Sequence, residues 1–74
     1  MFRRNQKLEH EVYVKNEEDL RVLKIILELL NIEFTTEEKS KGTMVKFYVK
    51  RKHSWAVVRK IQENLNDYTM RYEA

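Results

Sequence analysis

The 74-residue sequence contains no cysteine, no proline and a single glycine, Gly42. Without cysteine the chain can form neither a disulfide nor a thiolate metal site, and a reducing, cytoplasmic setting is expected. Because proline and glycine are the main turn-forming residues, nearly all of the chain is expected to be regular structure. No apolar run approaches the roughly 20 residues that span a bilayer, so no membrane association is expected.

The charged residues are distributed unevenly between the two halves of the chain. Residues 1–37 contain six Lys or Arg and eight Asp or Glu, a net charge of −2. Residues 38–74 contain nine Lys or Arg and four Asp or Glu, a net charge of +5, so the whole chain has a net charge of +3. From Lys39 to Gln62 there are eight basic residues and no acidic one. Such an asymmetry predicts one basic face.

A segment of the first half recurs in the second half with an offset of 35 residues. Tyr13-Val14-Lys15 returns as Tyr48-Val49-Lys50, and eight of the twenty positions from Val12 to Asn31 are identical to their counterparts. Self-similarity at a fixed offset is typical of one structural unit used twice. Each unit predicts a strand, a helix and a second strand.

The predicted elements follow a basic tail at residues 1–8. Alternation of β-branched or aromatic residues with polar ones predicts strands, and apolar residues at helical spacing predict helices. The strands are expected at residues 9–15, 32–38, 43–50 and 67–73, and the helices at residues 17–31 and from about residue 54 to residue 65. Asn16 and Ser54 are the expected N-caps, and Asn31 is expected to end the first helix. Gly42 is expected to supply a positive φ in a hairpin turn at residues 39–42.

The same periodicities predict which side chains form the core. The inward residues are expected to be His10, Val12, Val14, Leu20, Leu23, Ile26, Leu27, Leu30, Ile32, Phe34, Val45, Phe47, Val49, Trp55, Val57, Val58, Ile61, Gln62, Leu65, Tyr68, Met70 and Tyr72. The apolar arc of the first helix covers roughly 220°, against about 100° for an ordinary surface helix. Val22, Ile25 and Leu29 lie on the flank of this arc. They are expected either to pack against the second helix or to form a surface for a dimer or another protein partner.

This order of elements resembles the ferredoxin-like fold, an α+β architecture. A right-handed crossover in each half and a hairpin between the halves give a four-stranded antiparallel sheet with both helices on one face. The resemblance implies the strand order 4-1-3-2 for a single domain over residues 9–74.

No residue pattern typical of catalysis or of metal binding is present. His10 has the inward parity of the first strand, and a structural histidine is expected there rather than a metal ligand. His53 and Ser54 are adjacent in sequence, which does not make a nucleophile–base pair, because such pairs come from separated segments. The sequence contains no phosphate-binding loop and no dinucleotide fingerprint. The protein is therefore expected to be non-enzymatic and to need no cofactor.

The outward face of the sheet is expected to carry Tyr13 and Tyr48 on neighbouring central strands. The cations expected around these tyrosines are Lys15, Lys46, Lys50 and Arg71. Aromatic side chains among cations suit stacked bases and backbone phosphates. Two observations oppose this interpretation: strand tyrosines often pack across strands, and several glutamates share this face. These glutamates are Glu11, Glu33, Glu37 and Glu73.

The start of the second helix differs most between the two repeats. Arg51-Lys52-His53-Ser54 replaces Asn16-Glu17-Glu18-Asp19. Cations at the positive end of a helix oppose its dipole by about 0.3–1 kcal/mol each. Together with the unpaired backbone N–H groups of a first turn, they would suit an anion. Alternatively, Arg51 and Lys52 simply extend into water.

Val12-Tyr13-Val14-Lys15-Asn16 is similar to the first-strand motif of RNA-recognition motif domains, which reads aliphatic, aromatic, aliphatic, any residue, Asn. The resemblance implies that Tyr13 stacks on a base. In the third strand, Lys41-Gly42 fits the opening of the family's motif and Tyr48 its closing aromatic. Thr43 and Val45 occupy the two aromatic stacking positions of that motif, which leaves Tyr48 as a substitute.

Two functional hypotheses follow. The first is a module for single-stranded RNA or DNA, with Tyr13 and Tyr48 stacking on bases and the cations holding phosphates. These cations are Lys15, Lys46, Lys50, Arg51, Lys52 and Arg71. The second is a regulatory protein–protein interaction module that uses Val22, Ile25 and Leu29 to bind either a second copy of itself or another protein.

Overall fold

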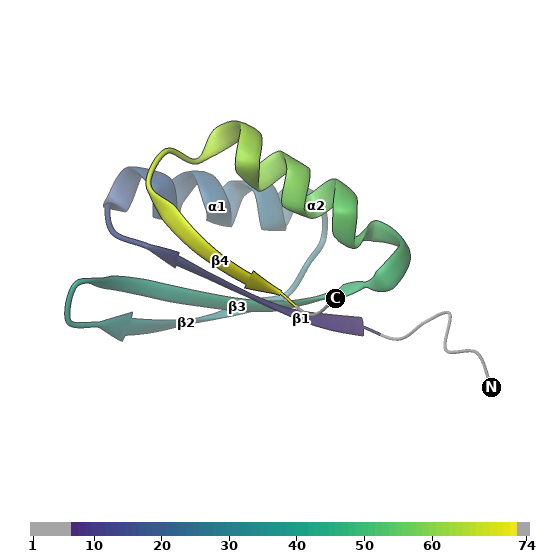
Figure 1. Cartoon of the computed structure of the whole chain (residues 1–74), viewed down its shortest axis with the longest axis horizontal. Helices are drawn as coiled ribbons and strands as arrows, with labels where there is room; N and C mark the ends of the chain where they lie inside the picture. The colour runs from purple at the N-terminus through teal and green to yellow at the C-terminus, as the bar shows by residue number, and fades with distance from the viewer. Residues whose placement is uncertain (1–6, 73–74) are drawn as a thin grey trace.

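The computed structural model describes residues 7–72, with Tyr72 described by its backbone alone. Its elements are β1 (Lys7–Val14), α1 (Glu17–Leu29), β2 (Phe34–Lys39), β3 (Gly42–Lys50), α2 (Arg51–Asn64) and β4 (Tyr68–Tyr72). The β2–β3 hairpin joins the two halves (Figure 1). All strand pairs are antiparallel, and the sheet has the order β2-β3-β1-β4. This is the predicted order 4-1-3-2, read from the other edge.

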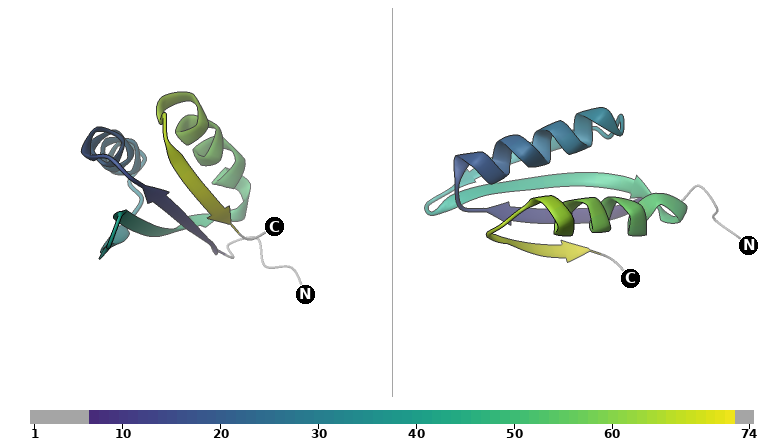
Figure 2. Two further views of the ribbon diagram at one scale, coloured as in Figure 1. Left: turned by 60° about the vertical axis from the view of Figure 1, so that its left-hand side comes forward. Right: turned by 90° about the horizontal axis from the view of Figure 1, so that it is seen from above.

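Both helices cover the same face of the twisted sheet and leave the other face open (Figure 2). The core lies between the two layers, and Val12, Leu27, Phe47 and Ile61 in it have no exposed surface. Full burial of such an apolar side chain contributes about 1.5–3 kcal/mol. Strand alternation places His10 in this core too, as predicted, and its ring stacks on Phe47 with centroids 5.3 Å apart. Within the described residues, neither helix combines the length and apolar character needed to cross a bilayer.

The first strand begins earlier than the alternation of residues 9–15 predicted. β1 starts at Lys7, and Leu8 is buried with 5% of its surface exposed. Leu8 has the same parity as His10 and Val12, so extending the strand adds one more apolar side chain to the core. The assignment of residues 7 and 8 to a tail was therefore wrong, and residues 1–6 lie outside the described residues.

The predicted N-cap of α1 is confirmed, whereas the helix ends at Leu29, earlier than predicted, with Leu30 as its C-cap and Asn31 directly after it. The Asn16 side chain accepts a hydrogen bond from the backbone N–H of Asp19 at 2.7 Å. Asn31 has a φ of 59°, and the N–H groups of Asn31 and Ile32 donate to the carbonyls of Glu28 and Leu27. This pair of bonds is the Schellman motif. Because Ile32 is held by it, β2 begins at Phe34 and not at residue 32 as predicted.

Gly42 has a different role from the one predicted. The hairpin turn comprises Ser40 and Lys41, with Lys39 paired to Gly42, and no glycine has a positive φ. A Cβ at residue 42 would instead collide with the carbonyl oxygen of Val14 and lie 3.0 Å from Cζ of Tyr13. Glycine is needed here for the close approach of β1, not for its backbone freedom.

The start of α2 also departs from the prediction. The helix begins at Arg51, directly after β3, and its N-cap is Lys50, which makes no side-chain capping bond. Ser54 is therefore inside the first helical turns and is not a cap. Trp55, predicted to be in the core, is 64% exposed. At 100° per residue it lies about 120° from the buried Ile61, and so faces away from the sheet.

The remaining core predictions hold for most positions. Leu20, Ile32, Phe34, Tyr68 and Met70 are partly buried against the core. Leu30 is 44% exposed and Gln62 is exposed, which corrects both predictions. The side chain of Tyr72 lies outside the described residues.

The flank of α1 does not pack against α2 as a continuous surface. Val22 is partly buried against the core, whereas Ile25 is 48% and Leu29 81% exposed. Figure 2 shows the two helices separating towards the end of α1 and the start of α2. Packing against the second helix was therefore the wrong interpretation for Ile25 and Leu29.

Candidate nucleic-acid interface

The two tyrosines lie on the central strands β1 and β3, but they are not neighbours. Tyr13 pairs with Met44 and Tyr48 pairs with Glu9, so they are separated by four residues along β3, or about 13 Å. Tyr13 is partly buried, with its ring over Gly42. Tyr48 is 50% exposed. Tyr48 therefore presents an accessible ring, whereas part of the Tyr13 ring is used in packing.

Lys46, between the two tyrosines, is held by carboxylates of the neighbouring strand. Its Nζ lies 3.4 Å from a carboxylate oxygen of Glu9 and 3.8 Å from one of Glu11. The hydrogen bond to Glu9, followed by the charges of Glu9 and Glu11, raises the pKa of Lys46. The charge of Lys46 is thereby compensated within the sheet, and the centre of the open face is not basic.

Lys15 and Arg71 lie apart from the other predicted cations. Lys15 follows the end of β1, which pairs with the start of β3, so it is at the opposite end of the sheet from Lys50. Arg71 is exposed on the edge strand β4, where its cross-strand neighbour is Glu11. The structure therefore divides the predicted site instead of assembling all of its residues.

The predicted residues that the structure does bring together lie at the junction of β3 and α2. Lys50, Arg51 and Lys52 are consecutive and all exposed, two residues after Tyr48. No acidic residue is present in the first turn of α2. Lys7 of β1 is paired with Lys50, which adds a fourth cation. We call these residues (Lys7, Tyr48, Lys50, Arg51 and Lys52) the junction cluster.

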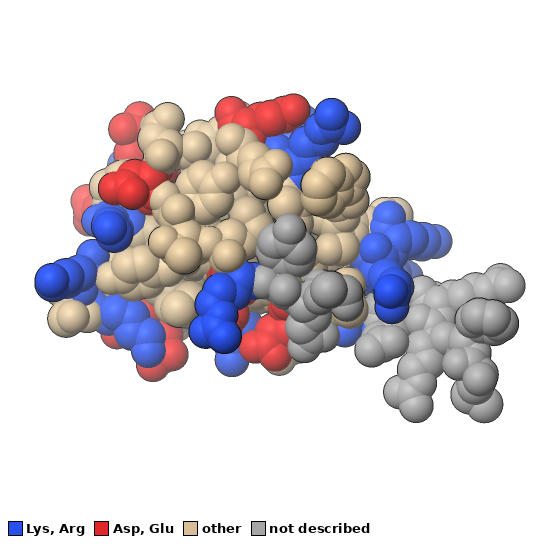
Figure 3. Space-filling view, in the orientation of Figure 1, with Lys and Arg blue, Asp and Glu red and all other residues tan. Residues whose placement is uncertain are grey.

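The charge distribution agrees with this division. Figure 3 shows cations at the end of the molecule where α2 begins and a second group at the β2–β3 hairpin end, with a broad surface of uncharged residues between them. The start of α2 lies at the first end of the molecule, and the β2–β3 hairpin, whose sequence includes Lys39 and Lys41, lies at the second (Figure 1). Lys39 is paired with Glu37 at 3.2 Å. The junction cluster is therefore the more concentrated positive region.

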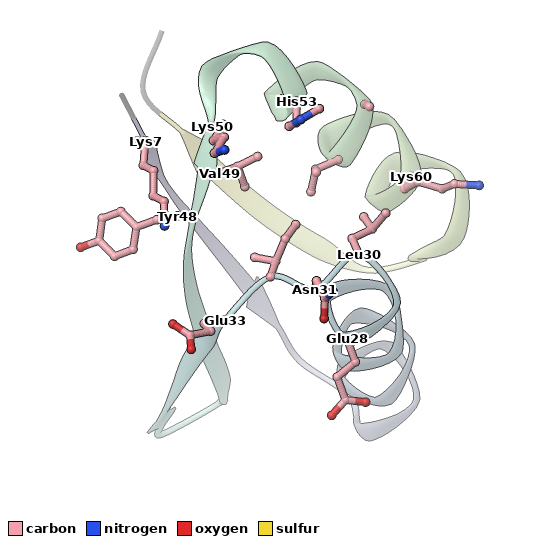
Figure 4. Close-up of a pocket in the computed structure, with 13 residues that line it drawn as sticks. Lys7, Glu28, Leu30, Asn31, Glu33, Tyr48, Val49, Lys50, His53 and Lys60 are labelled. Carbon is pink, nitrogen blue, oxygen red and sulfur yellow. The ribbon is translucent and has the colours of Figure 1, made fainter. Parts of the chain in front are cut away.

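A groove of about 970 Å³ lies beside the junction cluster, between the end of α1 and the first half of α2. Apolar residues line much of it: Leu30, Ile32, Val49, Ala56 and Val57. Lys7, Tyr48, Lys50, His53 and Lys60 also line it, with Glu28, Asn31 and Glu33. Figure 4 shows Leu30 and Val49 directed into the space between the helices, and the Tyr48 ring on the outer side of β3 beside Lys7.

Sequence reasoning missed two residues near this cluster. Lys7 was assigned to the tail, although Leu8 continues the alternation of the first strand and could have revealed it. Trp55 was assigned to the core because it is apolar. It lies on the same helical stripe as the polar residues Arg59 and Gln62, at i+4 and i+7, and this stripe was the available signal for an exposed position.

Two buried polar contacts hold the frame of the site. Asp19 is 1% exposed, and its carboxylate accepts hydrogen bonds from the backbone N–H groups of Asn66 at 3.2 Å and Asp67 at 2.8 Å. The bond from Asp67 is the largest cause of a lowered pKa for Asp19, and burial acts against it. The loop before β4 is therefore fastened to the first turn of α1.

The second contact joins β1 to α2. Nε2 of His10 lies 2.9 Å from the Ser54 hydroxyl, and Nδ1 lies 3.1 Å from the carbonyl oxygen of Leu8. Because a carbonyl only accepts, Nδ1 carries the proton in the neutral ring and Nε2 accepts from Ser54. His10 is fully buried and neither residue lines the groove, so this contact positions α2 on the sheet. Within residues 7–72 no group of three potential metal ligands is present.

Neither a protein-family model nor a curated protein matches the chain. Among solved structures, it is similar to the de novo designed protein Ferredog-Diesel, with 14% identity and a TM-score of 0.65, over all of this chain and 90% of that one. A functionally unknown protein from Pediococcus pentosaceus has 12% identity and a TM-score of 0.64, over 89% and 87% of the two chains.

A third similar structure is described as a candidate C-terminal regulatory domain of aspartate kinase from Porphyromonas gingivalis. It has 16% identity and a TM-score of 0.59, and the match covers 90% of this chain and 52% of that one. The chain thus spans about half of that domain. At these identities the likenesses show the fold alone, which is the ferredoxin-like βαββαβ fold.

Proposed function

We propose that this domain binds single-stranded nucleic acid at the junction cluster. One observation carries the proposal: α2 begins without a side-chain cap or an acidic residue, and its first turn instead carries exposed cations next to a half-exposed tyrosine. Tyr48 stacks on a base, and Lys7, Lys50, Arg51 and Lys52 contact the phosphates on either side of it.

The positions of the four cations favour an extended, flexible polyanion over a single phosphate as the ligand. Four cations on two adjacent strands and a helix start are spread along the end of the sheet, and a nucleic-acid backbone can reach several of them at once. Each contacted phosphate releases counterions, which makes the affinity salt-dependent. Stacking of one base on an aromatic ring adds about 1–3 kcal/mol.

The other predicted residues have smaller roles in this proposal. The similarity of residues 12–16 to the first-strand motif of RNA-recognition motif domains supports a second base at Tyr13, but the packing of its ring on Gly42 limits the exposed area. Lys46 contributes little because Glu9 and Glu11 compensate its charge. Lys15 and Arg71 lie away from the junction cluster, so only a longer nucleic-acid chain would contact them. Trp55, one helical turn after Arg51, supplies a further exposed aromatic surface.

The proposal is tested by fluorescence anisotropy with a mixed-sequence single-stranded RNA and the corresponding DNA at two salt concentrations. We expect the wild type to bind more weakly at higher salt, and Tyr48→Ala to lose about 1–3 kcal/mol of binding free energy. Arg59→Ala is the matched control, because Arg59 lies on α2 outside the cluster and is paired with Glu63 at 4.0 Å. Equal effects of the two substitutions, or no salt dependence, would contradict the proposal.

A second candidate function is a regulatory protein-interaction module. The exposure of Ile25 and Leu29 favours it, because a helix that only covered a sheet would not need apolar residues at these positions. The likeness to a structure described as a regulatory domain is consistent with such a role. Both functions can reside in one domain, since Ile25 and Leu29 are not among the residues that line the groove beside the junction cluster.

A further inference from the structure

An apolar stripe runs along α1 on a side that the rest of the described chain leaves largely uncovered. Val22, Ile25 and Leu29 are spaced by three and four residues, which is the spacing of the contact positions of paired helices. At 100° per residue, Val22 and Leu29 lie about 20° apart and Ile25 within about 60° of both. We call these three residues the α1 seam. Its exposure rises towards the end of the helix, where Leu29 is 81% exposed.

The charges beside the α1 seam indicate what covers it. Arg21 and Glu28 are seven residues apart, so they lie on one line along the helix, about 20° from each other and on the same side of the seam. Both are exposed, and neither forms an ion pair with any residue of the described range 7–72. The line has a basic residue near the start of α1 and an acidic residue near its end. A second copy of α1 that runs in the opposite direction would therefore place an acidic residue beside each basic one.

A two-fold axis passing beside Ile25 uses this complementarity. In two antiparallel copies of α1, Ile25 then meets Ile25 of the other copy, and Val22 lies near Leu29 of the other copy. The same axis places Arg21 opposite Glu28 of the other copy, twice, as an isologous contact requires. A parallel arrangement would bring this charged line against the opposite side of the seam, and would not pair Arg21 with Glu28.

We infer that the domain forms a homodimer through antiparallel contact of two α1 helices, with the α1 seam at the centre and reciprocal Arg21–Glu28 pairs at its edge. This inference rests on the second candidate function and names its partner as a second copy of this chain. A contact limited mainly to one helix from each copy is small, so a weak dimer is expected, with a Kd on the order of 100 μM.

Sedimentation equilibrium from about 1 μM to about 1 mM spans this affinity range and tests the inference. Leu29→Glu is expected to raise the dimer Kd at least about tenfold, because it puts two carboxylates into the apolar seam. Arg21→Glu and Glu28→Arg, each alone, should raise the Kd several-fold by placing like charges opposite each other. The double variant R21E/E28R restores opposite charges and should return the Kd to within about twofold of the wild-type value.

The controls separate this inference from the proposed nucleic-acid site. Tyr48→Ala should leave the dimer Kd unchanged while weakening oligonucleotide binding. Leu29→Glu should leave the affinity for a short oligonucleotide unchanged while disrupting the dimer, and its circular dichroism and melting temperature should match the wild type because Leu29 is so exposed. A chain that stays monomeric at the highest concentration, or a double variant no better than its parents, would overturn the dimer and leave the nucleic-acid proposal standing.

Discussion

The two repeats of the chain start their helices in opposite ways. The first turn of α1 has an Asn16 cap and the acidic residues Glu17, Glu18 and Asp19, which favour the positive end of the helix dipole. The first turn of α2 has no side-chain cap and no acid, and carries Arg51 and Lys52. The same unit is therefore optimised for stability in its first copy, whereas its second copy keeps a destabilising arrangement that suits an anion.

The comparison extends to the last residues of the two corresponding segments, 16–19 and 51–54. Asp19 and Ser54 correspond at the offset of 35 residues, and each fastens its helix to a distant part of the chain. Asp19 binds the loop that precedes β4, and Ser54 binds His10 in β1. A charged acceptor holds two backbone donors in the first case, and a hydroxyl holds one ring nitrogen in the second. The first half thus has the stronger anchor, and the following substitutions probe this difference.

Asp19→Ala is expected to have the largest effect. It removes the acceptor for the N–H groups of Asn66 and Asp67 and the charge at the start of α1, and it leaves polar backbone groups without their partner. For a domain of this size we expect the melting temperature to fall by about 10 °C or more. Differential scanning fluorimetry measures this directly. Asp19→Asn, which keeps one acceptor oxygen, should lie between Ala and the wild type; an Ala variant as stable as the wild type would contradict the anchoring role.

Acidification should reproduce part of this loss. The pKa of Asp19 is lowered in the folded state, mainly by the hydrogen bond from Asp67, so the stabilisation is fully present above the unfolded-state pKa of about 3.9. It is lost as the pH falls through that value towards the folded-state pKa. Urea unfolding at pH 7, 4 and 3 should show the wild type losing more stability than Asp19→Asn. Parallel losses in the two proteins would exclude Asp19 as the titrating anchor.

Ser54→Ala tests the weaker anchor. It removes the hydroxyl that lies 2.9 Å from Nε2 of His10 and should cost about 1–2 kcal/mol of unfolding free energy. The cost should be smaller than that of Asp19→Ala, because one hydrogen bond is lost, whereas Asp19→Ala leaves two backbone N–H groups without their carboxylate acceptor. Urea denaturation measures both. Ser54→Thr keeps the hydroxyl and is the control. Equal losses of unfolding free energy in the Ala and Thr variants would mean that side-chain packing, and not the hydrogen bond, determines the effect.

Local patterns predicted most of the fold, because alternation and capping depend on neighbours in sequence. The inward parity of Val12 and Phe47, the N-cap Asn16 and the turn at Asn31 after α1 are of this kind. The errors have non-local causes. Gly42 is explained by the carbonyl of Val14 on another strand. Trp55 was misplaced because apolar character does not decide which side of a helix faces the sheet when Val58 and Ile61 already fill the inner positions.

The candidate site divides in the same way. Lys50, Arg51 and Lys52 could be predicted as a cluster, since they are consecutive and open a helix. The distance between Tyr13 and Tyr48 could not, because it depends on the register of β1 against β3. For the same reason the pairing of Lys46 with Glu9 and Glu11 appears only when the strands are aligned.

The smallest expected effect comes from giving α2 the type of start that α1 has. Lys50→Asp places a carboxylate at the N-cap of α2, where it can accept from the first-turn N–H groups and favour the helix dipole. We expect about 0.5–1 kcal/mol of added stability by urea denaturation. The same substitution should weaken oligonucleotide binding several-fold at low salt, because it replaces a cation of the junction cluster by an anion.

The opposite signs of these two effects make the comparison testable in one variant. Lys41→Asp is the matched control, with the same change of charge in the exposed hairpin turn, and it should change stability and binding little. A gain in stability without a loss of affinity would mean that the cations at the start of α2 serve no anion. A loss of affinity without a gain in stability would mean that the first-turn N–H groups of α2 already have hydrogen-bond acceptors in the wild type. Only the combined result supports a helix start in which stability is reduced in favour of binding.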